Sequence, residues 1–157
     1  MNRRVIAAVL LCVLLLTACG TAEKPEASER PVIPTETPTE ESSMKLWINE
    51  TEVPVTWEQN DSVAALQTLA QGDGLEISMS MYGGFEQVGP VGQSLPREDR
   101  QTATSAGDIV LYSGNQIVLF YGANSWAYTR LGHVELSASE MTALLGSGNV
   151  TLRIAEG

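Results

Sequence analysis

Aromatic and basic side chains recur at alternate positions near the C-terminal end of the chain. Trp126, Tyr128 and Arg130 are separated from one another by single residues. Because successive side chains of a strand point to opposite faces, a strand here presents all three on one face. Aromatic rings with one arginine suit an extended peptide or a flat ligand, through stacking and hydrogen bonds to carbonyl groups. The alternative is that these rings fill the interior of a barrel.

A second aromatic pair lies earlier in the chain. Tyr82 and Phe85 bracket Gly83 and Gly84, and glycine lets a backbone or a ligand approach closely. We therefore treat both groups as one set of ligand-binding candidates. The set consists of Tyr82, Gly83, Gly84, Phe85, Trp126, Tyr128 and Arg130.

Other residue patterns argue against hydrolytic and metal chemistry. His133 is the only histidine, and the sequence contains no Gly-x-Ser-x-Gly turn, so a nucleophile with an adjacent base is not indicated. Glu98 and Asp99 lie between Arg97 and Arg100, which indicates a solvated loop rather than a cation site. We expect no catalytic residue, no metal ligand and no cofactor.

The first 18 residues have the organisation of an export signal. Arg3 and Arg4 precede an apolar run over residues 5–16, and small residues follow it. This order of a positive end, an apolar segment and a small-residue cleavage site is typical of secretory signals. The run is shorter than the roughly 20 residues that a membrane-spanning helix needs.

The end of this signal carries a cysteine with distinctive neighbours. The segment Leu16–Cys19 resembles the bacterial lipobox, in which a diacylglyceryl group alkylates the thiol before the chain is cut ahead of it. The resemblance implies lipidation at Cys19 and a protein anchored to the extracytoplasmic face of the cell membrane, where two acyl chains give stable attachment. The alternative is an ordinary secreted signal with a chance cysteine.

Removal of residues 1–18 has two further consequences. Cys12 is lost with the signal and Cys19 carries lipid, so no disulfide or thiolate metal site remains. The whole chain has a formal net charge of −10, and the signal removes two of its basic residues. An acidic surface repels phosphate, so we expect no nucleic acid partner.

Residues 19–44 form the predicted tether between the lipid and the folded domain. They contain four prolines and six glutamates but few apolar residues, a composition that favours an extended, solvated chain. A regulatory or partner-binding tail is the alternative to a spacer.

The folded domain is predicted over residues 45–157. Alternating apolar residues predict strands at 46–48, 53–57, 75–82 and 150–154, with further strands near 102–104, 109–112, 116–121 and 126–131. Asn60 and a Ser137–Glu140 capping box predict two short helices, and residues 83–96 are predicted to form a long loop. We therefore expect a mostly β domain, with an antiparallel sheet closed into an eight-stranded barrel and capped by two helices.

Several segments of this domain resemble the bacterial cyclophilin-like family. The matching segments are Met81–Gly89, Leu95–Pro96, Gly107–Tyr112, Asn115–Val118, Tyr121–Gly122 and Trp126–Leu131. The resemblance implies a cyclophilin barrel with a binding groove. True cyclophilins carry a catalytic arginine in a Phe-His-Arg segment, and this sequence has no such segment.

The resemblance therefore implies a fold and a groove, and not isomerase chemistry. Our leading hypothesis is a membrane-anchored lipoprotein with a non-catalytic cyclophilin-like binding or accessory domain, whose partner is an extended peptide or protein segment. One alternative is an extracytoplasmic peptidyl-prolyl isomerase that uses Arg130. The other is a barrel that binds a small molecule.

Overall fold

The computed structural model describes residues 44–157. The predicted signal, the lipidation site at Cys19 and the tether up to residue 43 lie outside the described residues. Within residues 44–157 there are ten strands and two helices, and every strand pairing is antiparallel. The elements are β1 (Met44–Ile48), β2 (Thr51–Val53), β3 (Val55–Trp57), α1 (Asp61–Leu69), β4 (Leu75–Tyr82), β5 (Glu86–Pro90), β6 (Arg100–Ala103), β7 (Asp108–Tyr112), β8 (Gln116–Phe120), β9 (Ser125–Val134), α2 (Ala138–Leu145) and β10 (Val150–Glu156).

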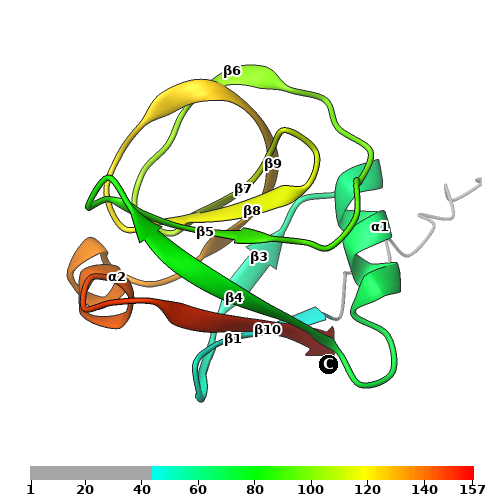
Figure 1. Cartoon of the computed structure of the whole chain (residues 1–157), viewed down its shortest axis with the longest axis horizontal. Helices are drawn as coiled ribbons and strands as arrows, with labels where there is room; N and C mark the ends of the chain where they lie inside the picture. The colour runs from blue at the N-terminus through cyan, green and yellow to red at the C-terminus, as the bar shows by residue number, and fades with distance from the viewer. Residues whose placement is uncertain (1–43) are drawn as a thin grey trace, which may run out of the picture. The chain divides into compact units, whose positions relative to one another are not determined.

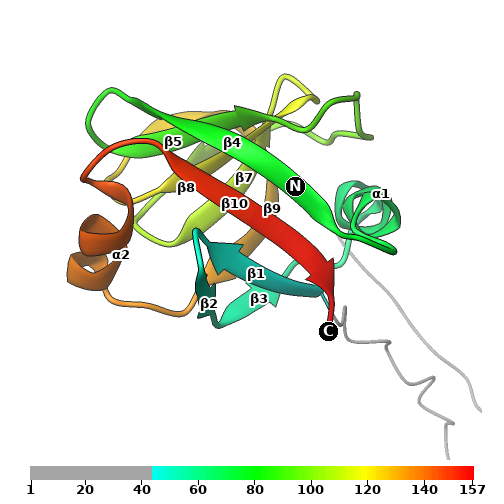
Figure 2. The same ribbon diagram turned by 60° about the horizontal axis from the view of Figure 1, so that its bottom comes forward.

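The strands form a nearly closed barrel. The hydrogen-bonded order is β2-β1-β10-β4-β5-β8-β7-β9-β3, and β6 pairs with β9 outside this path (Figure 1). Figure 2 shows β1, β10 and β4 side by side along one wall. This confirms the prediction of a mostly β, antiparallel barrel with two helices.

The path among the described residues holds nine strands rather than the predicted eight, and β6 is a tenth strand outside it. Two of these ten strands were not predicted separately, and Pro54 accounts for one of them. It separates β2, which pairs with β1, from β3, which pairs with β9. Proline has no N–H to donate to a ladder, so it interrupts what would otherwise be one strand. Because only one residue separates β2 from β3, the covalent chain itself joins the two ends of the path.

Two short helices pack at opposite sides of the barrel (Figure 1). Helix α1 begins at the predicted cap, where the Asn60 side chain accepts a hydrogen bond from the Val63 N–H at 3.0 Å. Helix α2 begins with the predicted capping box, in which Ser137 and Glu140 each accept from the backbone of the other. Buried Leu66 and Met141 anchor the helices to the core.

The central strands bury both of their faces. Ile109 and Leu111 on β7 enter the main core, together with Ile117 and Leu119 on β8. The residues between them face the other way, where Val110, Val118, Phe120 and Tyr128 form a second apolar cluster with Phe85 and Val88 at its edge. Burial on both faces explains why these strands are nearly continuous apolar runs in the sequence.

The prediction of one long loop over residues 83–96 is wrong, because β5 lies within it. Its C-terminal residues, Gly89 and Pro90, are typical of turns and hide the strand. The packing explains the glycine, because a Cβ at Gly89 would lie 2.5 Å from the Met79 sulfur and 2.6 Å from an Ile77 methyl carbon. Only glycine lets β5 approach β4 this closely.

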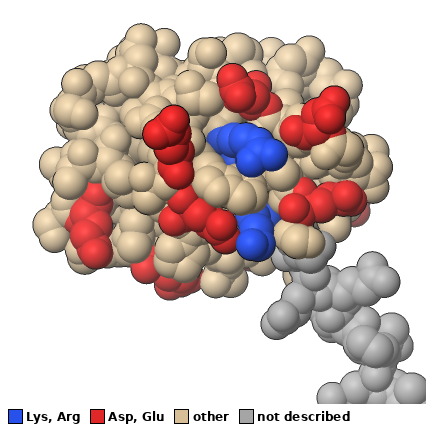
Figure 3. Space-filling model, turned by 90° about the horizontal axis from the view of Figure 1, so that it is seen from below, with Lys and Arg blue, Asp and Glu red and all other residues tan. Residues whose placement is uncertain are grey.

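Most of the charged side chains of the described domain are acidic. Figure 3 shows one face on which a few basic side chains lie among more numerous carboxylates. Basic residues are paired locally: the Lys45 ammonium lies 3.2 Å from Glu52, and the Arg153 guanidinium lies 4.8 Å from the centre of the Trp47 ring. No helix among residues 44–157 is both long enough and apolar enough to cross a membrane.

Candidate functional site

The second apolar cluster forms the floor of a pocket. Strand β9 pairs with β6 over Ser125–Tyr128 and with β7 over Thr129–His133, and one extra residue interrupts the register beside Ile109 and Val110. Such a bulge bends a strand, so the first half of β9 curves away with β6 and arches over the outer face of β7 and β8 (Figure 1). The space between this arch and the sheet is the pocket.

The pocket has a volume of about 350 Å³, within the range of small-ligand sites. Its lining residues are Tyr82, Glu86, Val88, Tyr112, Gln116, Val118, Asn124, Trp126 and Tyr128. They come from β4, β5, β7, β8 and β9 and from the loop before β9. The described lining residues thus include four aromatic rings and one carboxyl group, and no basic side chain.

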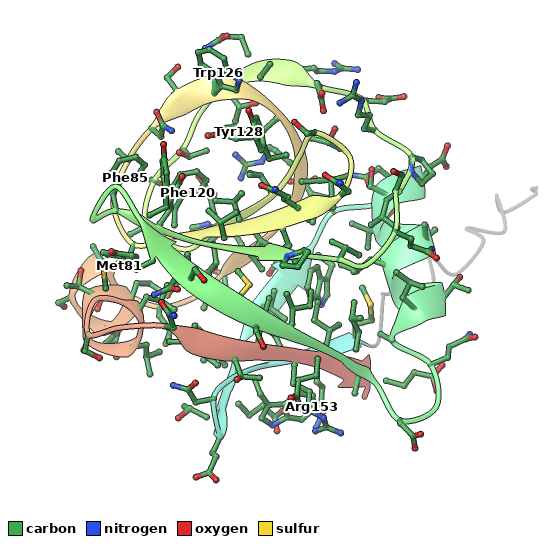
Figure 4. The ribbon with its side chains drawn as sticks, viewed as in Figure 1. Met81, Phe85, Phe120, Trp126, Tyr128 and Arg153 are labelled. Carbon is green, nitrogen blue, oxygen red and sulfur yellow. The ribbon has the colours of Figure 1, made fainter. Side chains whose placement is uncertain are left out.

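The aromatic rings form both the rim and the wall of the pocket. Tyr82 and Trp126 are largely exposed, at 66% and 58%, whereas Tyr128 is buried. The Tyr128 ring makes edge contacts with Tyr112, at 6.1 Å between centroids, and with Phe120, at 5.8 Å. In Figure 4, Tyr128, Phe120 and Phe85 lie within the ring of strands and Trp126 lies on the arch. Large exposed rings around a hollow are typical of a binding surface.

Glu86 is the one charged residue that lines the pocket. It is only 6% exposed, and its Oε2 atom is buried without a hydrogen-bond partner among the described residues. Burial raises the pKa of the Glu86 carboxyl above its ordinary value of 4.5. Burial also raises the pKa of Tyr128, with a further contribution from the charge of Glu86. The Tyr128 hydroxyl is held by the Asn124 amide, which donates to it at 3.1 Å.

The structure brings together three of the seven predicted ligand-binding residues. Tyr82, Trp126 and Tyr128 all line the pocket. Gly83 and Gly84 form the turn between β4 and β5 with positive φ angles of 61° and 74°, which glycine adopts readily. Phe85 does not line the pocket, and its ring folds against Gly83 and packs on the second apolar cluster.

The seventh residue, Arg130, lies outside the aromatic pocket. Its guanidinium lies 2.9 Å from an Asp108 oxygen and 3.3 Å from a Glu58 oxygen, at a separate hollow beside α1. The expectation that Trp126, Tyr128 and Arg130 share one face is therefore only partly correct. The reason is the change of partner along β9, because a strongly curved strand does not keep alternate residues on one flat face.

Asp108 is the centre of a polar network that sequence patterns do not reveal. It is buried, and one oxygen accepts from Arg130 while lying 2.9 Å from His133 Nδ1. The other oxygen accepts from the Ser105 N–H at 2.8 Å. Burial alone would raise the pKa of Asp108, but these bonds and the Arg130 charge together lower it below the ordinary 3.8. His133 is thus a hydrogen-bonded partner of a structural carboxylate.

Metal-ligating side chains do not gather in threes anywhere in residues 44–157. Glu98 and Asp99 lie near β6, where their carboxylates pair with Arg100 and Arg97 at 3.4 Å. These contacts are exposed or half-exposed and are typical of a solvated loop.

A comparison with known families identifies one that accounts for this architecture. The model of a group described as the cyclophilin-like family matches residues 46–155. No curated protein and no solved structure matches the chain. The match covers all but the outer ends of β1 and β10, and it includes both helices and all the residues that line the pocket.

Proposed function

The chain belongs to the cyclophilin-like family, and from this premise we propose that residues 45–157 form a non-catalytic ligand-binding domain carried on a lipid-anchored, extracytoplasmic protein. The observation that carries the proposal is the aromatic pocket of about 350 Å³. A hollow of this size, with apolar walls and a few polar groups, is the usual form of a small-ligand site. It favours a compact ligand, or one protruding group of a larger partner, over an extended peptide.

The absence of isomerase chemistry is supported by the position of Arg130. Prolyl rotation is accelerated when a cationic donor beside an apolar pocket withdraws the lone pair of the amide nitrogen. Arg130 is the candidate donor from the sequence, but it is paired with Asp108 and Glu58 and lies outside the aromatic pocket. A donor that is already paired with two carboxylates is poorly placed to polarise a substrate amide.

We predict that the full chain does not accelerate cis–trans exchange of a proline peptide beyond the uncatalysed reaction, which takes tens of seconds. Exchange is measured by NMR with wild type, Arg130→Ala and the control Arg153→Ala, which changes an arginine stacked on Trp47. Catalysis that disappears in Arg130→Ala and survives in Arg153→Ala would identify Arg130 as catalytic and contradict the proposal.

The proposed location depends on residues 1–19. The apolar run ends at a lipobox-like Leu16–Cys19 segment, and an acidic domain has no electrostatic attraction to an anionic bilayer. Attachment must then come from acyl chains on Cys19. The proline- and glutamate-rich segment that follows would act as a spacer, at up to about 3.1 Å per residue.

We predict that Cys19→Ser moves the protein from the membrane fraction to the soluble fraction or leaves it unprocessed. Detergent phase partitioning combined with intact-mass analysis measures both the anchor and the cleavage site. Cys12→Ser is the matched control, because Cys12 lies within the signal and is not expected to carry lipid. Wild-type partitioning and mass in Cys19→Ser would show that another feature anchors the protein.

A further inference from the structure

We propose that the aromatic pocket binds the ammonium group of a small organic cation, with Glu86 as its counter-ion. This inference rests on the proposed ligand-binding function and names the chemical class of the ligand. The ammonium can be primary or quaternary, since the features that recognise it are a negative charge and aromatic faces. The following observations of residues 44–157 carry it.

The first observation is the unpaired state of Glu86. Its side chain is more than nine-tenths buried, and Oε2 has no hydrogen-bond partner within the described residues. A buried carboxyl group without a partner destabilises a fold, so buried charges are usually paired. No other residue lining the pocket carries a formal charge. A cation entering the pocket would supply the missing partner.

The raised pKa of Glu86 supports the same conclusion. An acid whose pKa is raised by folding destabilises the folded state when it ionises. For Glu86, this loss of stability begins as the pH rises above the ordinary pKa of 4.5. Nothing in the described structure offsets this penalty: no hydrogen bond lowers the pKa of Glu86. A ligand cation would stabilise the ionised form and thus relieve it.

The aromatic lining is the second, independent observation. Tyr82, Tyr112, Trp126 and Tyr128 come from three different strands and surround the hollow that Glu86 lines. The faces of aromatic rings carry negative electrostatic potential and attract ammonium groups, and tryptophan does so most strongly. Tyr112 and Tyr128 meet at an interplanar angle of 66°, so the rings form walls of different orientation rather than one flat stack.

The charge of the pocket distinguishes a cationic ligand from an anionic or a neutral one. An anionic ligand would be repelled by Glu86 and by the net charge of −10. A neutral apolar group, such as a prolyl ring, would fit the walls but would leave Glu86 buried and unpaired. Cations satisfy both features, and the acidic surface raises their local concentration.

The test compares choline with 3,3-dimethylbutan-1-ol, which has the same shape without the charge, by calorimetric titration of the full chain at constant ionic strength. We expect choline to bind at least about tenfold more tightly than the neutral alcohol, in proportion to the cation–π and ion-pair contributions. Glu86→Gln should reduce this difference, because it removes the ion pair and leaves the aromatic rings in place. Glu76→Gln, an exposed change on β4 that lies outside the pocket lining, should preserve it.

A second variant guards against misfolding of Glu86→Gln. Trp126→Leu alters a largely exposed ring and should weaken choline binding while leaving the melting temperature unchanged. Equal binding of the charged and neutral probes, or no effect of Glu86→Gln, would overturn the cation assignment and leave a neutral-ligand pocket. If Nα-acetyl-lysine methylamide bound much more tightly than choline, a protein side chain would replace the small cation as the ligand. If none of the three probes bound, the cation inference would fail.

Discussion

Replacing Phe120 with alanine is expected to lower the free energy of unfolding by about 4 kcal/mol. Phe120 is completely buried, and it lies in the second apolar cluster rather than in the main core. Its ring also makes an edge contact with Tyr128. The alanine variant would leave a cavity beneath the pocket, so we expect a loss of stability together with a loss of ligand binding.

Urea denaturation of the full chain, followed by tryptophan fluorescence, measures this change. The control is Tyr82→Ala, which removes an aromatic ring that is 66% exposed at the pocket rim. Its cost in stability should stay below about 0.5 kcal/mol, although it also removes part of the binding surface. If the two variants lost the same stability, the second cluster would not be a core, and the described floor of the pocket would be wrong.

The second large effect is expected at Asp108. Replacing it with alanine should lower the free energy of unfolding at neutral pH by about 2–3 kcal/mol. The reason is that one buried carboxylate accepts hydrogen bonds from the Ser105 N–H and the Arg130 guanidinium and contacts His133 Nδ1. These contacts link the start of β7 to β9, so their loss weakens the base of the arch that covers the pocket.

The pH dependence of the free energy of unfolding distinguishes the contribution of the Asp108 charge from that of its side-chain shape. Folding lowers the pKa of Asp108 below its ordinary value of 3.8. The ionised carboxylate therefore stabilises the fold fully at pH values above the unfolded-state pKa. This stabilisation is lost as the pH falls through the folded-state pKa. Wild type should therefore lose stability below about pH 4 more steeply than Asp108→Asn. Unfolding curves at several pH values test this, and equal slopes for the two proteins would contradict the network.

Local patterns in the sequence predict much of the fold. Strict alternation over Leu75–Tyr82 and Val150–Ile154 matches strands β4 and β10, which bury one face. Asn60 and the Ser137–Glu140 capping box match the observed starts of both helices. These signals act between neighbouring residues, so the sequence displays them directly.

Features made by long-range contacts are the ones that the sequence hides. Glu86 lies just after a glycine turn, in a segment predicted as loop, and its burial depends on the arch of β9 almost 40 residues later. Strands β7 and β8 bury one face in the main core and the other in the second apolar cluster. Their sequences therefore lack the alternation of apolar and polar residues that marks a half-buried strand. The change of partner along β9, from β6 to β7, separates Arg130 from the rings that precede it. The sequence does contain one indication of the site, because an acidic residue ends the aromatic and glycine-rich segment Tyr82–Glu86.

The central claim is that the aromatic pocket is the ligand-binding site of this domain, and the three tryptophans allow one direct measurement. The indole N–H signals of the ¹⁵N-labelled full chain are recorded during separate titrations with a cationic, a neutral and an anionic fragment. The Trp57 indole is buried and donates to the Met44 carbonyl, and Trp47 lies under Arg153 outside the pocket lining. The account predicts that Trp126 alone shifts in a saturable manner. No shift of Trp126 with any fragment, or equal shifts of Trp47 and Trp126, would contradict it.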